Sequence, residues 1–293
     1  MERENRFWRV VLLFLPLSVF AVFVVWPLFS SFWYSFTDWN GFNPDYAFVG
    51  LDNYARIWTD RLFYGAIINT AMWMVAAIVL PTLLGLALAL LLDRQIRGAR
   101  IFKTIFYLPI CLSAIVVGQI WTWIYQPDWG LLNAIISFVA GEPFTHAWLA
   151  RPGSALWSVI VAWSWQQTGL SMVIYLAGLT AIPSDLLEVC DIEGATPWQR
   201  IRRVVVPLLI PSTIVVIALS VINSLKGFDI LYIMTGGGPF HSSDTLAMHM
   251  YNESFKKYLM GYGSAISVVL FLIALVIIGF YFRQLKRIDE IYG

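Results

Sequence analysis

Six long stretches of the 293-residue chain contain no Asp, Glu, Lys or Arg. They are residues 10–37, 62–92, 104–127, 152–184, 204–225 and 258–282. An α-helix rises about 1.5 Å per residue and the hydrocarbon core of a bilayer is about 30 Å thick, so about 20 apolar residues cross it. Each stretch reaches that length, whereas a transmembrane β-strand would be shorter and alternating. The pattern predicts an all-α, polytopic membrane protein with six transmembrane helices.

The composition supports this class, because 59% of the residues are hydrophobic and 13% are charged, about half the charge of a soluble domain. We place the spans at about 10–37, 64–92, 104–127, 154–182, 204–227 and 259–282. The first follows three arginines but is too long and bulky for a cleaved signal peptide, so we expect an uncleaved anchor. The two cysteines are far apart and indicate neither a disulfide framework nor a metal site.

The distribution of Lys and Arg predicts the orientation of the chain. Thirteen of these residues lie in the N-terminus, the loops at 93–103 and 185–203 and the C-terminus, and five lie in the alternate loops. The positive-inside rule therefore places both termini (1–9 and 285–293) and the segment 184–203 in the cytoplasm. We expect the external loops, 38–61 and 128–151, to form caps over any path that the spans enclose.

The densest mixed-charge segment lies between the fourth and fifth stretches and reads LLEVCDIEGATPWQRIRRVVVPLLIP (186–211). Ser184 is a candidate N-cap, and Gly194 ends the first short helix. The T-P-W-Q sequence at 196–199 is a capping-box pattern that starts a second helix. Together these signals predict a helix–glycine–helix elbow, residues 184–203. Anchoring to the cytoplasmic surface explains its three arginines but not its acids, and a DNA-binding helix-turn-helix would need a basic recognition face.

The elbow also resembles a known motif. EVCDIEGATPWQ (188–199), followed by VVVPLLIP (204–211), is similar to the EAA loop of binding-protein-dependent ABC importer permeases. YLAGLTAIPSDLLE (175–188) and FDILYIMTGGGP (228–239) resemble the sugar-permease branch that includes maltose, glycerol-phosphate and trehalose importers. Val189 and Cys190 replace the paired alanines of the motif, and Glu193 replaces the usual Asp.

This resemblance implies a permease subunit in the cytoplasmic (inner) membrane of a prokaryote, importing a di- or oligosaccharide. Its partners would be a second permease, an ATPase dimer and an extracytoplasmic sugar-binding protein, with no nucleic acid. The chain has no G-x-x-x-x-G-K-[ST] motif, so it would not be an enzyme. It would bind no cofactor itself, because ATP and Mg would sit on the ATPase. The residues that the resemblance assigns to ATPase coupling are Glu188, Asp191, Glu193, Gly194, Ala195 and Gln199.

Polar residues inside the spans are candidates for the substrate path, because polar groups in lipid are costly and usually face a bundle interior. On the fifth span the spacing i, i+3, i+4, i+7 puts four of them on one face: Ser220, Asn223, Ser224 and Gly227. The candidates on the third and fourth spans are Trp123, Gln126, Trp165, Gln166 and Gln167. Helix packing explains the first group equally well from spacing alone, and an aromatic belt is a simpler explanation for Trp123. The resemblance favours sugar contact on the fifth span. Lys226 and Asp229 are expected to form a structural pair at its end.

Two other classes of protein remain open. A stand-alone secondary transporter would carry an internal repeat and a buried ion-coupling carboxylate, and a membrane-embedded glycan enzyme would carry clustered acids or histidines at a membrane face. The spans show no such repeat or carboxylate, and the acidic cluster lies in the elbow. His146, His241 and His249 are separate and lack metal-ligand spacing, so we expect no metal.

Overall fold

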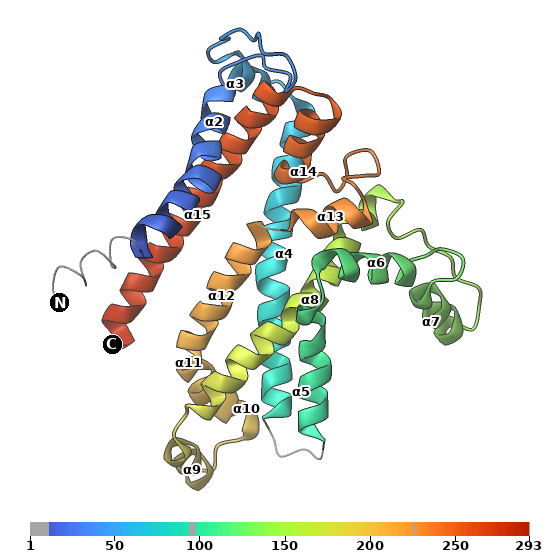
Figure 1. Ribbon diagram of the computed structural model, residues 1–293. Coiled ribbons are helices and arrows are strands. Elements are labelled where there is room, and N and C mark those ends of the chain that lie inside the picture. Colours follow the sequence, from blue (N-terminus) through green and yellow to red (C-terminus); the bar gives the residue numbers. More distant parts are fainter. Residues whose placement is uncertain (1–11, 94–97, 226, 293) are drawn as a thin grey trace, which may run out of the picture. The chain divides into compact units, whose positions relative to one another are not determined.

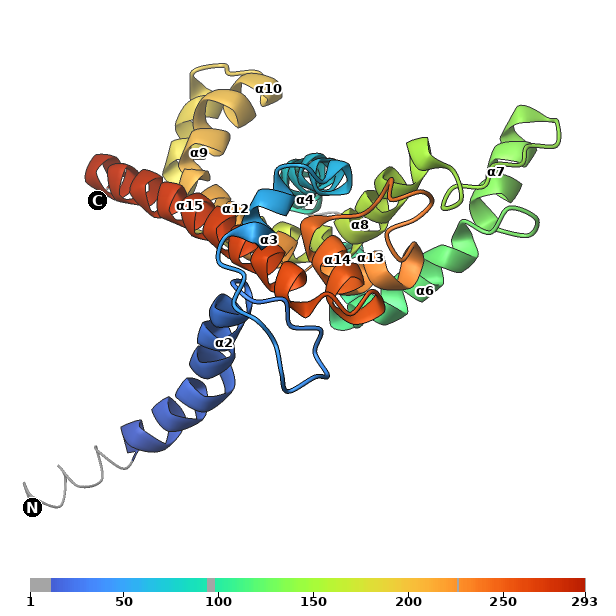
Figure 2. The same cartoon turned by 90° about the horizontal axis from the view of Figure 1, so that it is seen from above.

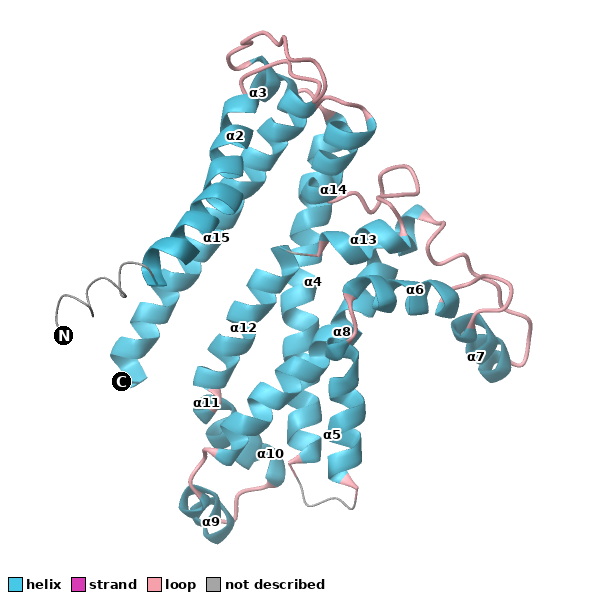
Figure 3. Ribbon diagram, in the orientation of Figure 1, coloured by secondary structure: helices cyan, strands magenta, loops and turns pink. Residues whose placement is uncertain are grey.

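The computed structural model describes residues 12–93, 98–225 and 227–292, and every regular element within them is a helix (Figure 3). The predicted all-α class is confirmed. The helices form two compact units. One contains Gly65–Met248 with the chain from Ile278 onward, and the other contains the chain up to Tyr64 with His249–Ile277.

Three helices are long and apolar enough to cross a membrane without a break: Leu12–Tyr34, Arg61–Leu92 and Met260–Tyr281. The other apolar helices form three bent pairs. They are Ala99–Cys111 with Ala114–Ile124 (107°), Pro152–Thr180 with Ser184–Ile192 (76°), and Pro197–Leu208 with Ile210–Leu225 (65°). The predicted spans at 104–127 and 204–227 thus each contain a bend.

The bend in the third region has a local cause. Here α5 (Ala99–Tyr107) and the 3-10 turn η2 (Leu108–Cys111) end at Leu112, whose ψ of 146° is extended. The next residue, Ser113, caps α6 (Ala114–Ile124) by accepting a hydrogen bond from the Val116 N–H at 3.3 Å. A serine followed by an apolar run is an N-cap signal, but in a long uncharged stretch it is easily read as part of one helix.

The core of the larger unit forms where α4 (Arg61–Leu92), α8 (Pro152–Thr180), η3 (Ile201–Val205), α11 (Val206–Leu208) and α12 (Ile210–Leu225) meet (Figure 1). Its buried side chains are Ala89, Leu92, Met172, Tyr175, Leu179, Val205, Leu209 and Val216. Glycines bring the backbones close, as is common between membrane helices. A Cβ atom on Gly85 would overlap Ser171 and lie 2.9 Å from the Met172 nitrogen, so α4 and α8 touch there.

Three shorter helices, α6, α7 (Leu131–Ala140) and α13 (Phe228–Met234), also belong to this unit. α6 packs against α13, and a Cβ atom on Gly118 would overlap the Ile233 side chain. α7 follows α6 and lies apart from α4 and α12 in both views (Figures 1 and 2). The short helices therefore extend this unit beyond its long helices.

The smaller unit holds α2 (Trp26–Tyr34) with the π-helical turn η1 (Ala21–Val25) before it, α3 (Asp52–Ile57), η4 (Asn252–Lys256) and the first part of α15 (Met260–Tyr292). α14 (Leu246–Tyr251) leads into η4. Asn53 on α3 donates hydrogen bonds to the carbonyls of Ser35 (2.9 Å) and Thr37 (2.8 Å). Glu253 is buried, with its carboxylate bonded to Lys257 and 3.8 Å from Arg56. Polar contacts thus tie the loop after α2 to α3, and η4 to α3.

The contact between Asp60 and Tyr262 in this unit is expected to stabilise the protein less as the pH falls. Burial raises the pKa of its carboxyl, but hydrogen bonds from the Tyr262 hydroxyl (2.7 Å) and the Leu62 N–H (2.9 Å), together with His249, outweigh burial and lower the pKa. Because the folded-state pKa is lowered, its stabilisation is present above about pH 4 and is lost as the pH falls through the folded value. In detergent, Asp60→Asn should lower the melting temperature at pH 7, and the difference from the native chain should shrink towards pH 3. Exposed Asp45→Asn is the control, and a constant difference for Asp60→Asn at all pH values would contradict this assignment.

Candidate functional site

The predicted elbow is present as two short helices, α9 (Ser184–Ile192) and α10 (Pro197–Arg200). Gly194 has a φ of +71°, the left-handed region that favours glycine. Its N–H bonds to the Asp191 carbonyl at 3.2 Å, and the Ala195 N–H bonds to the Cys190 carbonyl at 2.9 Å. These two bonds form a Schellman motif. The end of α9 therefore has one defined geometry rather than a frayed end.

The start of α10 is fixed as firmly. The Thr196 hydroxyl accepts from the Gln199 N–H at 3.3 Å, and the Thr196 N–H donates to the Gln199 side-chain oxygen at 2.8 Å. The predicted capping box is confirmed. The predicted N-cap of α9 is wrong by one residue, because Pro183 holds that position and Ser184 donates instead to its neighbour Asp185 at 3.4 Å. Proline has no side-chain acceptor, so α9 begins without a side-chain cap.

An ion pair joins the two elbow helices. Arg200 Nη1 lies 3.1 Å and 3.3 Å from the two oxygens of Asp191. The Asp191 side chain is 64% exposed and that of Arg200 34%, so the pair contributes at most about 1 kcal/mol. Two of the residues expected to face a partner, Asp191 and Gln199, thus have bonds inside the elbow. Their contacts shape the elbow.

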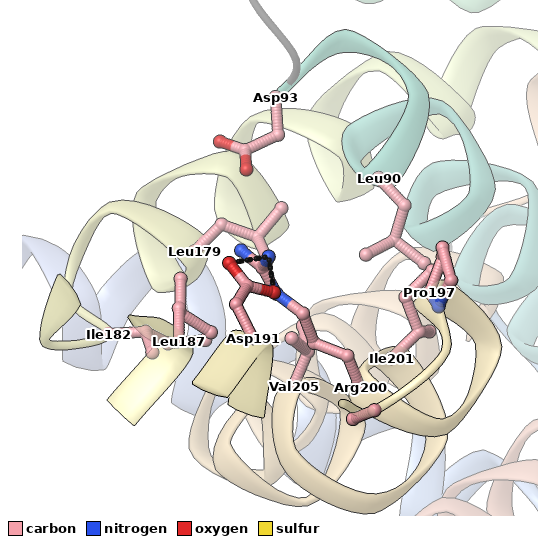
Figure 4. Close-up of a pocket in the computed structure, with 11 residues that line it drawn as sticks. Leu90, Asp93, Leu179, Ile182, Leu187, Asp191, Pro197, Arg200, Ile201 and Val205 are labelled. Carbon is pink, nitrogen blue, oxygen red and sulfur yellow. Dashed lines mark hydrogen bonds and ion pairs between the residues drawn. The ribbon is translucent and has the colours of Figure 1, made fainter. Parts of the chain in front are cut away.

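Behind this ion pair is a cavity of about 420 Å³ (Figure 4). The ends of α4 and α8 provide one side of it through Leu90, Asp93 and Leu179. The elbow and η3 provide the other side, including Leu187, Arg200 and Val205. The elbow therefore rests on the long helices around a partly open space.

The outward side of the elbow combines acids with apolar side chains. Glu188, Glu193 and Gly194 are exposed, and Ala195 is half-buried. Sequence reasoning missed four exposed apolar residues beside them: Leu186 (44%), Val189 (54%), Ile192 (85%) and Trp198 (68%). Their signal was the three-residue spacing of the apolar positions along α9. Exposed apolar groups next to carboxylates are typical of a protein-docking surface.

Two candidates for the substrate path meet between α8 and α12. The Asn223 amide donates to the side-chain oxygen of Gln167 at 3.2 Å. Gln167 is buried and Asn223 half-buried. This pair joins the two long helices that flank the elbow.

Gln166 has a different role, because its amide donates to the Leu112 carbonyl at 2.9 Å. That carbonyl sits at the 107° bend, where the helix cannot bond it, and an unpaired backbone group in lipid would cost several kcal/mol. Trp165 is 39% exposed and meets Trp121 edge-on at 5.9 Å. Neighbouring residues on a helix point about 100° apart, so Trp165, Gln166 and Gln167 face three different directions.

Two of the other candidates, Ser224 on α12 and Gly227 at the start of α13, lie against Trp73 of α4. Trp73 Nε1 donates to the Ser224 carbonyl at 3.0 Å, and a Cβ atom on Gly227 would lie 2.8 Å from Trp73 Cε2. Ser220 is buried. These contacts favour the packing interpretation for Ser224 and Gly227.

Trp123 is 55% exposed and Gln126 is half-buried. No side-chain hydrogen bond within residues 98–225 joins either of them to Asn223 or Gln167. The predicted pairing of Lys226 with Asp229 lies outside the described residues.

The chain is similar to known transport proteins in sequence and in fold. Residues 81–289 match the family "Binding-protein-dependent transport system inner membrane component". The chain is 35% identical to the trehalose/maltose transport system permease protein MalF of Thermococcus litoralis, over 90% of this chain and 89% of that protein. It is 34% identical to the probable starch degradation products transport system permease protein AmyD of Thermoanaerobacterium thermosulfurigenes, over 98% and 97%. A subunit of a bacterial ABC transporter involved in alginate import has a similar fold, with a TM-score of 0.83, 22% identity and 98% of each chain covered.

Proposed function

Because the chain belongs to the family of binding-protein-dependent transport system inner membrane components, we propose that it is the permease subunit of an ATP-binding-cassette importer for a sugar, a di- or oligosaccharide. The names of its relatives support a sugar substrate. A separate sugar-binding protein would deliver the sugar, as suggested by a structural neighbour crystallised with an alginate pentasaccharide-bound periplasmic protein. A second permease and an ATPase dimer, which would hold ATP and Mg, would complete the importer.

The proposed topology has six crossings of a prokaryotic inner membrane, because each of the three bent helix pairs contributes one crossing beside the three unbroken helices. In the second and third pairs the elbow helices α9 and α10 are the parts that lie outside the membrane. Both termini and the elbow then lie in the cytoplasm, as the distribution of Lys and Arg favours. In this arrangement α9 and α10 extend from the cytoplasmic ends of α8 and α12. The elbow is therefore placed to receive force from an ATPase.

The observation that carries the proposal is the outward side of the elbow. Glu188 and Glu193 are exposed there beside Val189, Ile192 and Trp198. An apolar centre with charged neighbours suits a groove in a partner protein, where buried apolar contacts give affinity and charges give orientation. The bonds inside the elbow keep its shape when force is applied.

Charge reversal at Glu188 tests this docking. In a preparation containing the neighbouring subunits, Glu188→Arg should reduce ATPase co-purification and ATP-driven sugar uptake by roughly tenfold or more, because truncating one partner of an interfacial charge pair costs about 2–5 kcal/mol. Glu142→Arg, at an exposed position outside the elbow, should leave both unchanged. Sugar uptake by the purified chain alone, without ATP, would overturn the importer assignment in favour of a secondary transporter.

The amide pair Asn223–Gln167 is the proposed substrate contact of this chain, since amides bond sugar hydroxyls. Asn223→Leu should raise the KM for uptake from the loaded binding protein several-fold, while the ATPase still co-purifies. Ile222→Leu on the same helix is the matched control, because Ile222 is 45% exposed and has no polar side-chain atom. An unchanged KM for Asn223→Leu would limit the pair to helix packing.

A further inference from the structure

The helix α7 turns its polar side chains inward. Asn133 is 4% exposed. Its amide donates to the carbonyls of Pro127 and His146, each at 3.0 Å, and its oxygen accepts from Trp148 Nε1 at 2.8 Å. Ser137 bonds both the N–H and the carbonyl of Phe144. The polar side chains of α7 are therefore bonded to the segments that precede and follow the helix.

The opposite face is apolar and exposed. Its large side chains are Leu131 (57%), Ile135 (50%), Phe138 (88%) and Val139 (79%). Their spacing, i, i+4, i+7, i+8, forms one stripe along the helix. This is the reverse of a helix on a soluble protein, which turns its apolar stripe to the core. An outward apolar stripe indicates that water does not cover this face.

The position of α7 in the chain indicates what covers it. It lies between the end of α6 at Ile124 and the start of α8 at Pro152, both of which belong to apolar helix pairs that we count as membrane crossings. The connecting segment must therefore leave and re-enter the membrane at the same surface. With ten residues, α7 is about 15 Å long and too short to cross.

We propose that α7 lies at the external surface of the inner membrane, in the interface between lipid and water. Its Leu131–Val139 stripe then faces the acyl chains of the lipid, and Asn133 faces the protein. The exposed Trp129 at the start of α7 suits the headgroup level, where tryptophan is enriched. The inference rests on the proposed topology. It replaces the expectation that all of segment 128–151 caps the translocation path.

Lipid fits this face better than a protein partner does. Residues 129–141 contain no charged residue, and Asp128 and Glu142 flank the helix on either side. The rims of protein–protein interfaces are polar and supply about one hydrogen bond per 100–200 Å². The stripe offers no side-chain donor or acceptor, and acyl chains require none.

Spin-label accessibility in nanodiscs of phosphatidylethanolamine and phosphatidylglycerol tests the proposal. Starting from Cys111→Ser and Cys190→Ser, single labels are placed at Phe138→Cys, at Leu83→Cys on α4 and at Glu142→Cys. The chain is purified together with its partner subunits. Collision rates are measured with molecular oxygen, which concentrates in lipid, and with nickel(II) ethylenediaminediacetate, which stays in water.

We expect the label at position 138 to favour oxygen over nickel several-fold, as the label at 83 does in the bilayer, while the label at 142 favours nickel. Nickel access at 138 with oxygen preference retained at 83 would overturn the inference and leave the topology intact. Low access of both reagents at 138, or a fall of both when sugar-loaded binding protein is added, would overturn it in favour of a protein partner. Nickel preference at 83 would instead contradict the proposed topology itself.

Discussion

Replacing Gly169 with alanine should destabilise the protein more than any other single added methyl group on α8. A Cβ atom there would overlap the carbonyl oxygen of Phe106 and lie 2.8 Å from Tyr107 Cα. Both neighbours are backbone at the end of α5, so they cannot rotate away as a side chain would. We expect Gly169→Ala to cost about 1–3 kcal/mol of stability and to lower the melting temperature in detergent by several degrees.

Gly153 on the same helix provides the matched control. A Cβ atom at Gly153 meets no atom within 4 Å, and alanine is favoured over glycine in a helix by about 0.5–1 kcal/mol. Gly153→Ala should therefore leave the melting temperature unchanged or raise it slightly. Equal melting temperatures for the two variants would show that α8 and α5 are not in close contact at Gly169.

The second large effect is expected at the elbow. In Gly194→Val a β-branched residue would have to adopt a φ of +71°, and the left-handed conformation costs an L-residue roughly 1–2 kcal/mol. That cost reduces the equilibrium constant for forming the intact turn by about 5–30-fold. We expect ATP-driven sugar uptake to fall by up to the same factor, measured in proteoliposomes that contain the complete importer.

Asparagine tolerates the left-handed conformation better than other non-glycine residues, so Gly194→Asn should retain most of the uptake. The difference between Val and Asn separates backbone geometry from the mere loss of glycine. If both variants were equally inactive, a close approach of a partner to the glycine, rather than its backbone angle, would be the cause. If both were fully active, the turn would have no role in coupling.

The elbow is the part of the molecule that could be predicted best from the sequence. Its signals are local: Gly194 for a left-handed turn, and Thr196 with Gln199 for a capping box. Local backbone chemistry decides such features, and tertiary contacts do not override them. The positions of the three unbroken apolar helices were also predictable, since length and lack of charge decide them.

The bends and the partners of the polar residues could not be predicted in this way. Leu112 and Ser113 look like part of one uncharged span, and only the amide of Gln166, 54 residues later in the chain, satisfies the carbonyl at the bend. Likewise, spacing put Asn223 and Ser224 on one face of α12, whereas the Asn223 amide donates to Gln167 of α8 and the Ser224 hydroxyl donates to the Val221 carbonyl of α12 itself. The spacing along a helix does not show which of its polar residues finds a partner on another helix.

The bond between Asn223 and Gln167 has a thermodynamic consequence. It joins α8 and α12, the same two helices that continue into the elbow, at positions about equally far along the chain from Gly194. The two helices are thus connected twice, by the elbow at one end and by the amide bond farther along. If sugar opens the amide pair and thereby changes the affinity of the elbow for the ATPase, linkage requires ATPase binding to change the affinity for sugar by the same factor. Sugar binding between the helices and ATPase binding at the elbow would then be coupled through one continuous stretch of chain, residues 167–223.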